Sequence, residues 1–237
     1  MIRSRALVAR RRPADPAAVA YASAALPTGR TPWRQARFCA LDFELTGLDR
    51  SHDEIISFGA IPIEGGRVKL RHAVSGLVRP ARDLSEPSIL VHGIRRADLA
   101  RAPLLHEAIA PLLRVLAGRV LIAHTAPVET SFLRRALRER GVRRRGPVID
   151  TEVLGCLWEW ERSGRLRKHV ALGELAAALG LPADRPHVAI GDALTTAQVF
   201  LALASHLDVR HADALLDGAG GAGRGEINLR RRLRHKI

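Results

Sequence analysis

Two acidic residues, Asp42 and Glu44, lie one residue apart in the segment Ala40-Leu-Asp-Phe-Glu-Leu-Thr-Gly47. The run before them, Arg37-Phe-Cys-Ala-Leu41, is almost wholly apolar, which is typical of a strand covered on both faces. Side chains two apart on a strand point to the same face, so both carboxylates project together. Like charges at one level repel each other unless a cation lies between them. Carboxylate oxygens suit Mg²⁺ or Mn²⁺, so the pair predicts a divalent metal site.

A strand that simply ends here would also carry two such acids, exposed to solvent before a turn at Thr46-Gly47. The fragment alone does not separate this interpretation from a metal site, because short motifs often arise by chance. Two later segments favour the metal site, since each adds an acid near the start of a helix. The first acid is Glu129, which follows a buried strand ending at His124 and lies just inside the next helix.

The second segment, Pro186-His-Val-Ala-Ile-Gly-Asp192, opens the last helix with a histidine and an acid five positions later. That spacing does not place the two side chains on one helical face. A joint role requires His187 to lie in the loop, where it can swing over a site that Asp192 helps to build. The sequence therefore offers one imidazole and four carboxylates at the end of a sheet, from His187, Asp42, Glu44, Glu129 and Asp192.

The elements that must position these groups follow from the spacing of apolar residues. After the strand that carries the acids, Glu64-Gly65-Gly66 predicts a hairpin turn between two further strands, which gives three antiparallel strands in succession. A loop with Pro80 and Pro87 then carries Val91-His-Gly-Ile94. The two hairpin strands are predicted at 54–63 and 67–78, and one later strand at 119–124. Helices are predicted at 17–25, 104–116, 129–140, 151–160, 172–179 and 188–207. Asp150 is expected to orient the helix that follows it rather than to bind metal.

Length and composition predict one α/β domain with two basic extensions. A chain of 237 residues, 47% of them hydrophobic, can bury one substantial core. We expect a basic Ala/Pro/Arg-rich extension over 1–35, the folded domain over 36–210, and a flexible basic tail over 211–237. The net charge of +14 favours an anionic partner, nucleic acid before membrane. Codon bias toward Arg and Ala can also produce such a charge, so charge supports this partner without establishing it.

Cysteine content and hydropathy bear on location. The two cysteines, Cys39 and Cys156, fall in a buried strand and a helix, which argues against a disulfide and favours a reducing compartment. No apolar run approaches the length of a membrane span, and the N-terminus has no apolar block of signal-peptide length. The expected location is therefore cytoplasmic.

The motifs, taken in order, resemble those of the DEDDh 3′→5′ exonucleases of the ribonuclease H-like superfamily. They are Asp-x-Glu-x-Thr-Gly at 42–47, His-x-Ala-x-x-acid-x-x-Phe-Leu at 124–133, and His-x-Ala-x-x-Asp at 187–192. The similarity spans about 37–206. Within the family, Val91-His-Gly-Ile94 is most similar to the corresponding segment of the epsilon-type proofreading exonucleases of bacterial DNA polymerase III.

This resemblance implies a ribonuclease H-like mixed sheet, with three antiparallel strands and then parallel strands, flanked by helices. It implies two divalent cations, Mg²⁺ or Mn²⁺, held by Asp42, Glu44 and Asp192, with Glu129 reaching one of them through water. His187 would take the proton of the attacking water, as a base working near neutral pH. The pair of ions would stabilise the attacking and leaving oxygens of an in-line displacement.

The resemblance also implies a substrate and partners. Leu45, Thr46 and Gly47 would cradle the terminal nucleotide, and His92 would approach it from its loop. The products would be 5′-mononucleotides from single-stranded or frayed 3′ ends, with DNA favoured over RNA. A polymerase or another protein could bind through the basic tails.

Three residues depart from the family pattern. The family usually carries Asp at the place of Glu129, Asn at Thr125, and often an aromatic residue at Val128. Glu129 keeps the charge but is longer by one methylene, which a ligand acting through water could absorb. The departures at Glu129 and Thr125, together with the basic tails, leave open a nucleic-acid-binding or polymerase-associated module with weakened catalysis. An exonuclease that acts on RNA is a further alternative, because Asp-Phe-Glu-Leu-Thr-Gly-Leu48 also resembles the oligoribonucleases, although the His-Gly-Ile segment argues against that branch.

Overall fold

A computed structural model describes residues 15–27, 31–82, 84, 86–165, 167–182 and 187–217, with side chains described as far as Leu207. Within these residues one six-stranded mixed sheet has the order β3-β2-β1-β5-β6, and β4 also pairs with β2. β2 is antiparallel to β1, β3 and β4, whereas β5 is parallel to its two neighbours, β1 and β6. The strands are β1 Phe38–Leu45, β2 Ile55–Glu64, β3 Arg67–Val68, β4 Val74–Leu77, β5 Val120–Ala123 and β6 Val148–Asp150. The predicted fold class is confirmed.

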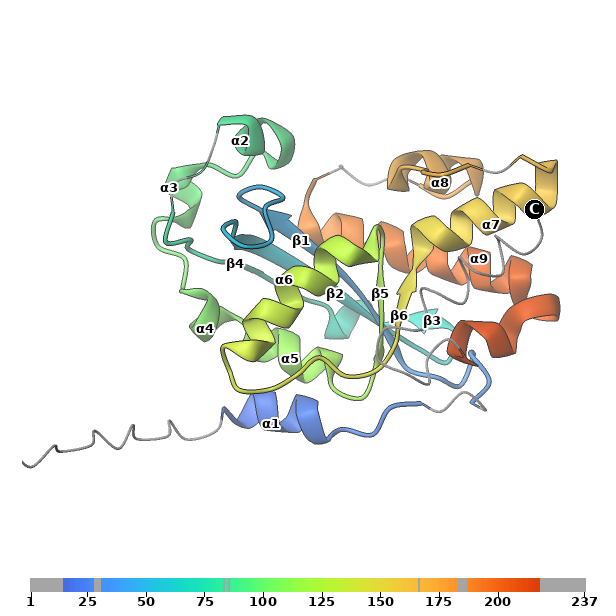
Figure 1. Cartoon of the computed structure of the whole chain (residues 1–237), viewed down its shortest axis with the longest axis horizontal. Helices are drawn as coiled ribbons and strands as arrows, with labels where there is room; N and C mark the ends of the chain where they lie inside the picture. The colour runs from blue at the N-terminus through green and yellow to red at the C-terminus, as the bar shows by residue number, and fades with distance from the viewer. Residues whose placement is uncertain are drawn as a thin grey trace, which may run out of the picture.

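Helices cover both faces of this sheet (Figure 1). α7, α8 and α9 contribute to the apolar layer on one face, and α1, α5 and α6 contribute to the layer on the other. The helices are α1 Pro16–Ser23, α2 Glu86–His92, α3 Arg96–Leu99, α4 Leu105–Ala108, α5 Ala110–Leu116, α6 Ala126–Arg138, α7 Thr151–Ser163, α8 Leu172–Ala178 and α9 Ala189–Asp217, with a 3₁₀ helix over Leu70–His72.

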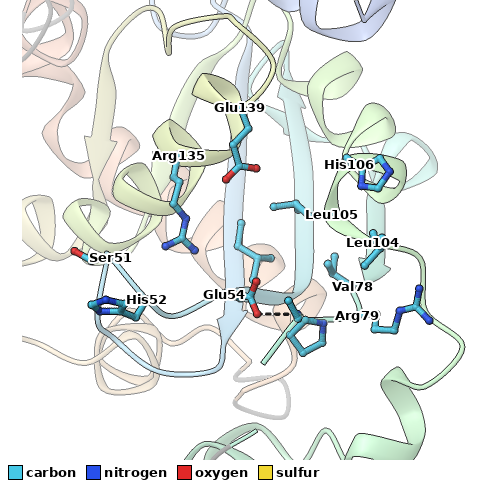
Figure 2. Close-up of a pocket in the computed structure, with 13 residues that line it drawn as sticks. Ser51, His52, Glu54, Val78, Arg79, Leu104, Leu105, His106, Arg135 and Glu139 are labelled. Carbon is cyan, nitrogen blue, oxygen red and sulfur yellow. Dashed lines mark hydrogen bonds between the residues drawn. The ribbon is translucent and has the colours of Figure 1, made fainter. Parts of the chain in front are cut away.

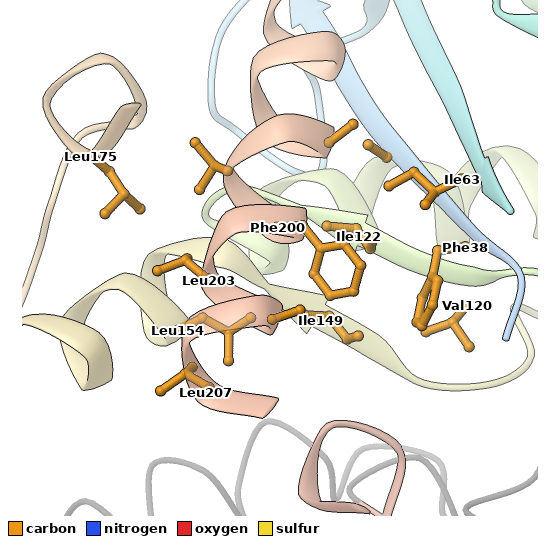
Figure 3. Close-up of a cluster of buried hydrophobic side chains, with 14 of the residues drawn as sticks. Phe38, Ile63, Val120, Ile122, Ile149, Leu154, Leu175, Phe200, Leu203 and Leu207 are labelled. Atoms are coloured by element: carbon orange, nitrogen blue, oxygen red, sulfur yellow. The ribbon is translucent and has the colours of Figure 1, made fainter. Parts of the chain in front are cut away.

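Alternation along β1 decides which face the acids occupy. Phe38 and Ala40 belong to the apolar cluster that includes α9, whereas Cys39 and Leu41 belong to the cluster on the opposite face. The Phe38 ring lies 4.9 Å from the ring of Phe200 on α9, near the centre of the cluster in Figure 3. Burying an aromatic side chain of this size stabilises the fold by roughly 1.5–3 kcal/mol. Because side chains alternate, the even-numbered residues that follow Ala40 also face α9.

Several element boundaries differ from the sequence prediction, and two of the differences trace to prolines. The third strand, predicted over 67–78, is interrupted by the 3₁₀ helix. Pro62 lies opposite this break and has no N–H for a strand ladder, although its carbonyl accepts from Lys69 N at 2.9 Å. The helix predicted over 104–116 is divided into α4 and α5, because Pro111 lies in the first turn of α5 and cannot continue a preceding helix.

Four further differences concern other elements. The segment around His92 is not a loop but the end of helix α2. α6 begins at Ala126, before the predicted start, and β6 was not predicted because three residues give too little pattern. α9 continues beyond the predicted Leu207 to Asp217, so the first residues of the predicted tail are helical. The rest of that tail, and most of the predicted N-terminal extension, lie outside the described residues.

The described part of the N-terminal extension packs on the folded domain. α1, predicted over 17–25, is confirmed at 16–23 and lies against α5. Its buried residues are Ala17, Ala18 and Tyr21. Among the described residues, no helix is both long enough and apolar enough to cross a membrane.

Candidate active site

Three of the predicted site residues converge where β1 ends and α9 begins. Asp42 and Glu44 come from β1 and Asp192 from the first turn of α9, and each offers one carboxylate oxygen within 4.8 Å of the others. Among the described residues, these three side chains lie close enough together to hold one metal ion. The two β1 acids therefore do not lie free in solvent beyond a strand end, because α9 brings a third acid against them.

Burial and mutual repulsion make these acids hard to ionise together. Glu44 is only 7% exposed, and burial together with the charge of Asp192 raises its pKa to about 7. The pKa of Asp42 is raised by burial and then by the charges of Glu129, Asp192 and Glu44. Carboxylates held this close favour either protonation or a bound cation.

Glu129 lies beside this group but is not one of its three members. It is 5% exposed on α6, and burial followed by the charge of Glu44 raises its pKa, while a hydrogen bond from the Phe43 backbone opposes the rise. Its Oε2 atom is buried without a hydrogen-bond partner. A buried carboxylate oxygen without a partner is costly, so this atom is available to a ligand or a water molecule.

The donor set fits a hard divalent cation. All four side chains offer carboxylate oxygens, which suit Mg²⁺ and Mn²⁺ better than softer metals. The clustered oxygens of Asp42, Glu44 and Asp192 would hold such an ion. The unpartnered Oε2 of Glu129 would also be stabilised by a nearby positive charge.

His187 lies where the sequence predicted, in the loop before α9. Its backbone N donates to Oδ2 of Asp192 at 2.7 Å, and its φ angle is +62°. Its side chain is exposed, so the imidazole is free to approach a ligand at the acids.

His92 reaches the same region from the end of α2. Its Nδ1 accepts from the backbone N of Ile94 at 3.0 Å, which leaves Nε2 as the ring's N–H. Nε2 is buried without a hydrogen-bond partner. Burial and the nearby His187 lower the pKa of His92, so the two imidazoles are close enough to interact electrostatically.

The loop after β1 is held by its own hydrogen bonds. The Thr46 hydroxyl donates to Asp53 Oδ1 at 2.8 Å and accepts from Glu54 N at 3.0 Å. A Cβ at Gly47 would lie 2.5 Å from Asp53 Oδ2, so a larger residue would displace the carboxylate that accepts from Thr46. The side chain of Leu45 packs in the core. Contacts of these residues with a ligand would therefore come mainly from the backbone.

A separate hollow of about 370 Å³ lies beside this loop (Figure 2). Arg135, which lines it from α6, donates to the backbone O of Arg50 at 2.9 Å and to that of Asp53, and so ties the loop to α6. Asp42, Glu44 and Asp192 do not line this hollow. Its walls come from Ser51, His52, Glu54, Ile55, Val78, Arg79, Pro80, Ala81, Leu104, Leu105, His106, Arg135 and Glu139.

Two other motif residues have structural roles. Both ring nitrogens of His124 are engaged, Nδ1 with Thr151 Oγ1 at 3.0 Å and Nε2 with the carbonyl of Val170 at 2.9 Å. Asp150 accepts from Glu152 N and from Ala126 N, each at 3.0 Å, so it joins the starts of α7 and α6. The prediction that Asp150 orients its helix is confirmed.

One residue that shapes this site, Gly59 on β2, was not predicted from the sequence. It lies opposite Asp42 in the β1–β2 register, and the start of α9 contacts it closely. The available signal was a glycine inside a strand, which often marks a close approach by another backbone.

Comparison with known proteins identifies the family. The sequence profile of the exonuclease family matches residues 39–200. The chain belongs to the exonuclease family. A DNA polymerase III subunit epsilon-like protein from Rhodobacter capsulatus is 34% identical over 183 residues, which cover 76% of this chain and 25% of that protein. The DNA polymerase III subunit epsilon of Aquifex aeolicus is 27% identical over 171 residues, which cover 72% of this chain and 81% of that protein.

The chain thus spans a quarter of the length of its R. capsulatus relative, and 12% of a PolC-type DNA polymerase III from Thermotoga maritima that is 35% identical. Solved structures agree on the fold. Escherichia coli exonuclease I with a dT13 oligonucleotide has a TM-score of 0.65 at 15% identity, covering 76% of this chain and 44% of that one. The DEDDh nuclease domain of 3′hExo bound to rAMP has a TM-score of 0.56 at 16% identity, covering 72% and 92%.

Proposed function

We propose that this exonuclease removes 5′-mononucleotides from the 3′ ends of DNA, using two divalent cations and a histidine base. The observation that carries the proposal is the convergence of Asp42, Glu44 and Asp192, whose oxygens lie within 4.8 Å of one another. When bound, divalent cations supply an activated water and neutralise the charge that develops during phosphodiester hydrolysis.

The four acidic residues of the site have different roles, which follow from their positions. Asp42, Glu44 and Asp192 would hold the cations, whose positive charge would relieve the repulsion among the three carboxylates. Glu129 acts from the side of α6, where its unpartnered Oε2 accepts a hydrogen bond from water or reaches a cation. Its additional methylene, relative to the usual Asp of the family, is compatible with contact through water.

His187 takes the proton of the attacking water. Its exposed imidazole lies on a loop beside Asp192, and imidazole is the side chain that most readily exchanges protons near neutral pH. His92 and the backbone of Leu45, Thr46 and Gly47 position the terminal nucleotide. The unpartnered Nε2–H of His92 offers a hydrogen bond to that nucleotide.

DNA is the favoured substrate because the relatives named above are parts or homologues of DNA polymerase III. Exonuclease X, 21% identical with a TM-score of 0.55 over 71% of this chain and 92% of its own, is bound to duplex DNA with a 5′ overhang. We also propose that a polymerase or another protein binds through the basic termini, and that the enzyme acts in the cytoplasm. RNA is the substrate to compare with DNA, because one structural neighbour is bound to rAMP.

The test is a digestion of matched single-stranded DNA and RNA oligonucleotides with Mg²⁺ or Mn²⁺, labelled at the 5′ end to follow shortening and on the 3′-terminal nucleotide to follow release. The wild type should shorten DNA stepwise from the 3′ end and release 5′-mononucleotides. Asp42→Asn should lower the rate on the order of 10²–10³-fold or more while the circular dichroism spectrum is unchanged. Absence of mononucleotide release at every metal concentration would refute catalysis.

Two results would support the alternatives instead. Faster digestion of RNA than of DNA would assign the chemistry to RNA. Salt-sensitive nucleic-acid binding without Mn²⁺ binding, measured by calorimetry, would indicate a module with decayed catalysis.

A further inference from the structure

Gly59 lies at the contact between the sheet and the helix that carries Asp192. In the β1–β2 register Gly59 is the partner of Asp42, and Ile61 and Ile63 on the same face of β2 pack in the α9 cluster. A Cβ at Gly59 would lie 2.3 Å from the carbonyl oxygen of Ala189 and 2.4 Å from Cα of Ile190. Both are backbone atoms, so no side-chain rotation could make room, and a larger residue would displace the start of α9.

Small residues on α9 allow the same close contact from the other side. Ala189 and Ala193 are 2% and 0% exposed and lie one helical turn apart, on either side of Asp192 in sequence. The contact that brings α9 against Gly59 is therefore the one that brings Asp192 against Asp42. The Asp42–Asp192 separation is set by the depth of this packing rather than by the acids themselves, because their charges repel.

We propose that Gly59 is a positioning residue, which sets the spacing of Asp42 and Asp192 and thereby the affinity of the site for divalent cations. This inference rests on the proposed function of the same site. Metal ligands tolerate only small displacements, about 0.2 Å in ligand distance and about 0.5 Å for a functional constellation. A side chain at position 59 acts on Asp192 through the α9 backbone and touches neither metal nor substrate.

The test measures Mn²⁺ binding by calorimetry in Gly59→Ala. Its matched control is Gly76→Ala on β4, where the added Cβ would meet the Phe58 ring at 2.7 Å but not α9. Both variants add one methyl to a glycine of the same sheet. Gly59→Ala should weaken Mn²⁺ binding by about 10- to 100-fold, the range for residues that support metal ligands. Gly76→Ala should lose thermal stability but keep the wild-type affinity.

A rescue experiment separates positioning from general destabilisation. Asp192→Glu lengthens the ligand and should weaken binding in the wild type, but it should restore part of the affinity in Gly59→Ala, because the longer side chain spans the widened gap. If Gly59→Ala does not fold, Ala193→Val adds volume next to Asp192 where α9 packs in the cluster that includes Ile61, and the same loss and rescue are expected. Unchanged Mn²⁺ affinity in a folded variant, or strictly additive effects, would overturn the proposal. Failure of the proposed function is distinguishable, because the wild type itself would then bind no Mn²⁺.

Discussion

The backbone N–H of His187 donates a 2.7 Å hydrogen bond to Oδ2 of Asp192. The same residue has a φ of +62°, a left-handed conformation that His, Asn and Asp adopt more readily than other non-glycine residues. One short loop therefore joins the proposed base to a proposed metal ligand. The backbone conformation at residue 187 and the chemistry of its side chain contribute differently to the site. Two different substitutions at this position can therefore test each contribution.

His187→Asn should keep the left-handed backbone but remove the base. We expect kcat to fall about 10²–10⁴-fold, the usual contribution of general base catalysis, while Mn²⁺ affinity stays near that of the wild type. His187→Val should reduce both, because a β-branched residue opposes this φ and disturbs the hydrogen bond to Asp192. Single-turnover kinetics and calorimetry check the two quantities. Equal loss of Mn²⁺ affinity in both variants would contradict this separation.

Glu44 should make the metal-free protein less stable as the pH rises. Its pKa is about 7 in the folded state, against an ordinary value of 4.5. Between these values the unfolded chain has released the proton and the folded chain has not, so the free energy of unfolding falls with increasing pH. Glu44→Gln, which cannot ionise, should gain stability relative to the wild type as the pH rises from about 4.5 to about 7, the window of that shift.

Thermal unfolding of both proteins across this range, in a chelating buffer, measures the effect. Saturating Mn²⁺ should reverse the order, because the wild type gains binding energy that the variant lacks. A stability difference independent of pH would argue that Glu44 is not the titrating group.

The sequence predicted most of the site because its signals are local. Asp42 and Glu44 share a strand face by parity alone, and His187 lies in a loop because its spacing to Asp192 excludes one helical face. The mixed sheet followed from the same alternation together with the resemblance to known exonucleases.

The remaining features depend on contacts between distant segments, which no local pattern encodes. Gly59 matters only because α9, more than a hundred residues later, packs on it. β6 is stable as three residues because it pairs with β5. The predicted substrate roles of Leu45 and Thr46 stay predictions, and their side chains serve the core and the loop in the described structure.

Thr125→Asn should stabilise the protein. Thr125 precedes α6 with φ +55° and ψ +50°, a conformation that strains a β-branched residue and that Asn tolerates. Strain of this kind costs about 1–3 kcal/mol, and the hydrogen bond lost, from Thr125 Oγ1 to Glu152 at 3.2 Å, is long. We expect about 1 kcal/mol more free energy of unfolding in urea. Thr125→Val is the control, and it should be no more stable than the wild type.

Removal of α1 should destabilise the folded domain, although it lies in the predicted extension over 1–35. Tyr21 is buried against α5, and its hydroxyl accepts from the backbone N of Arg145 at 3.2 Å, while Asp15 pairs with Arg140. Tyr21→Ala should cost about 2–4 kcal/mol, somewhat below the range for fully buried aromatic residues. Deletion of residues 1–27 should lower the melting temperature at least as much as Tyr21→Ala does. A melting temperature that the deletion leaves unchanged would return the domain boundary to its predicted position at residue 36, because α1 would then add nothing to the core.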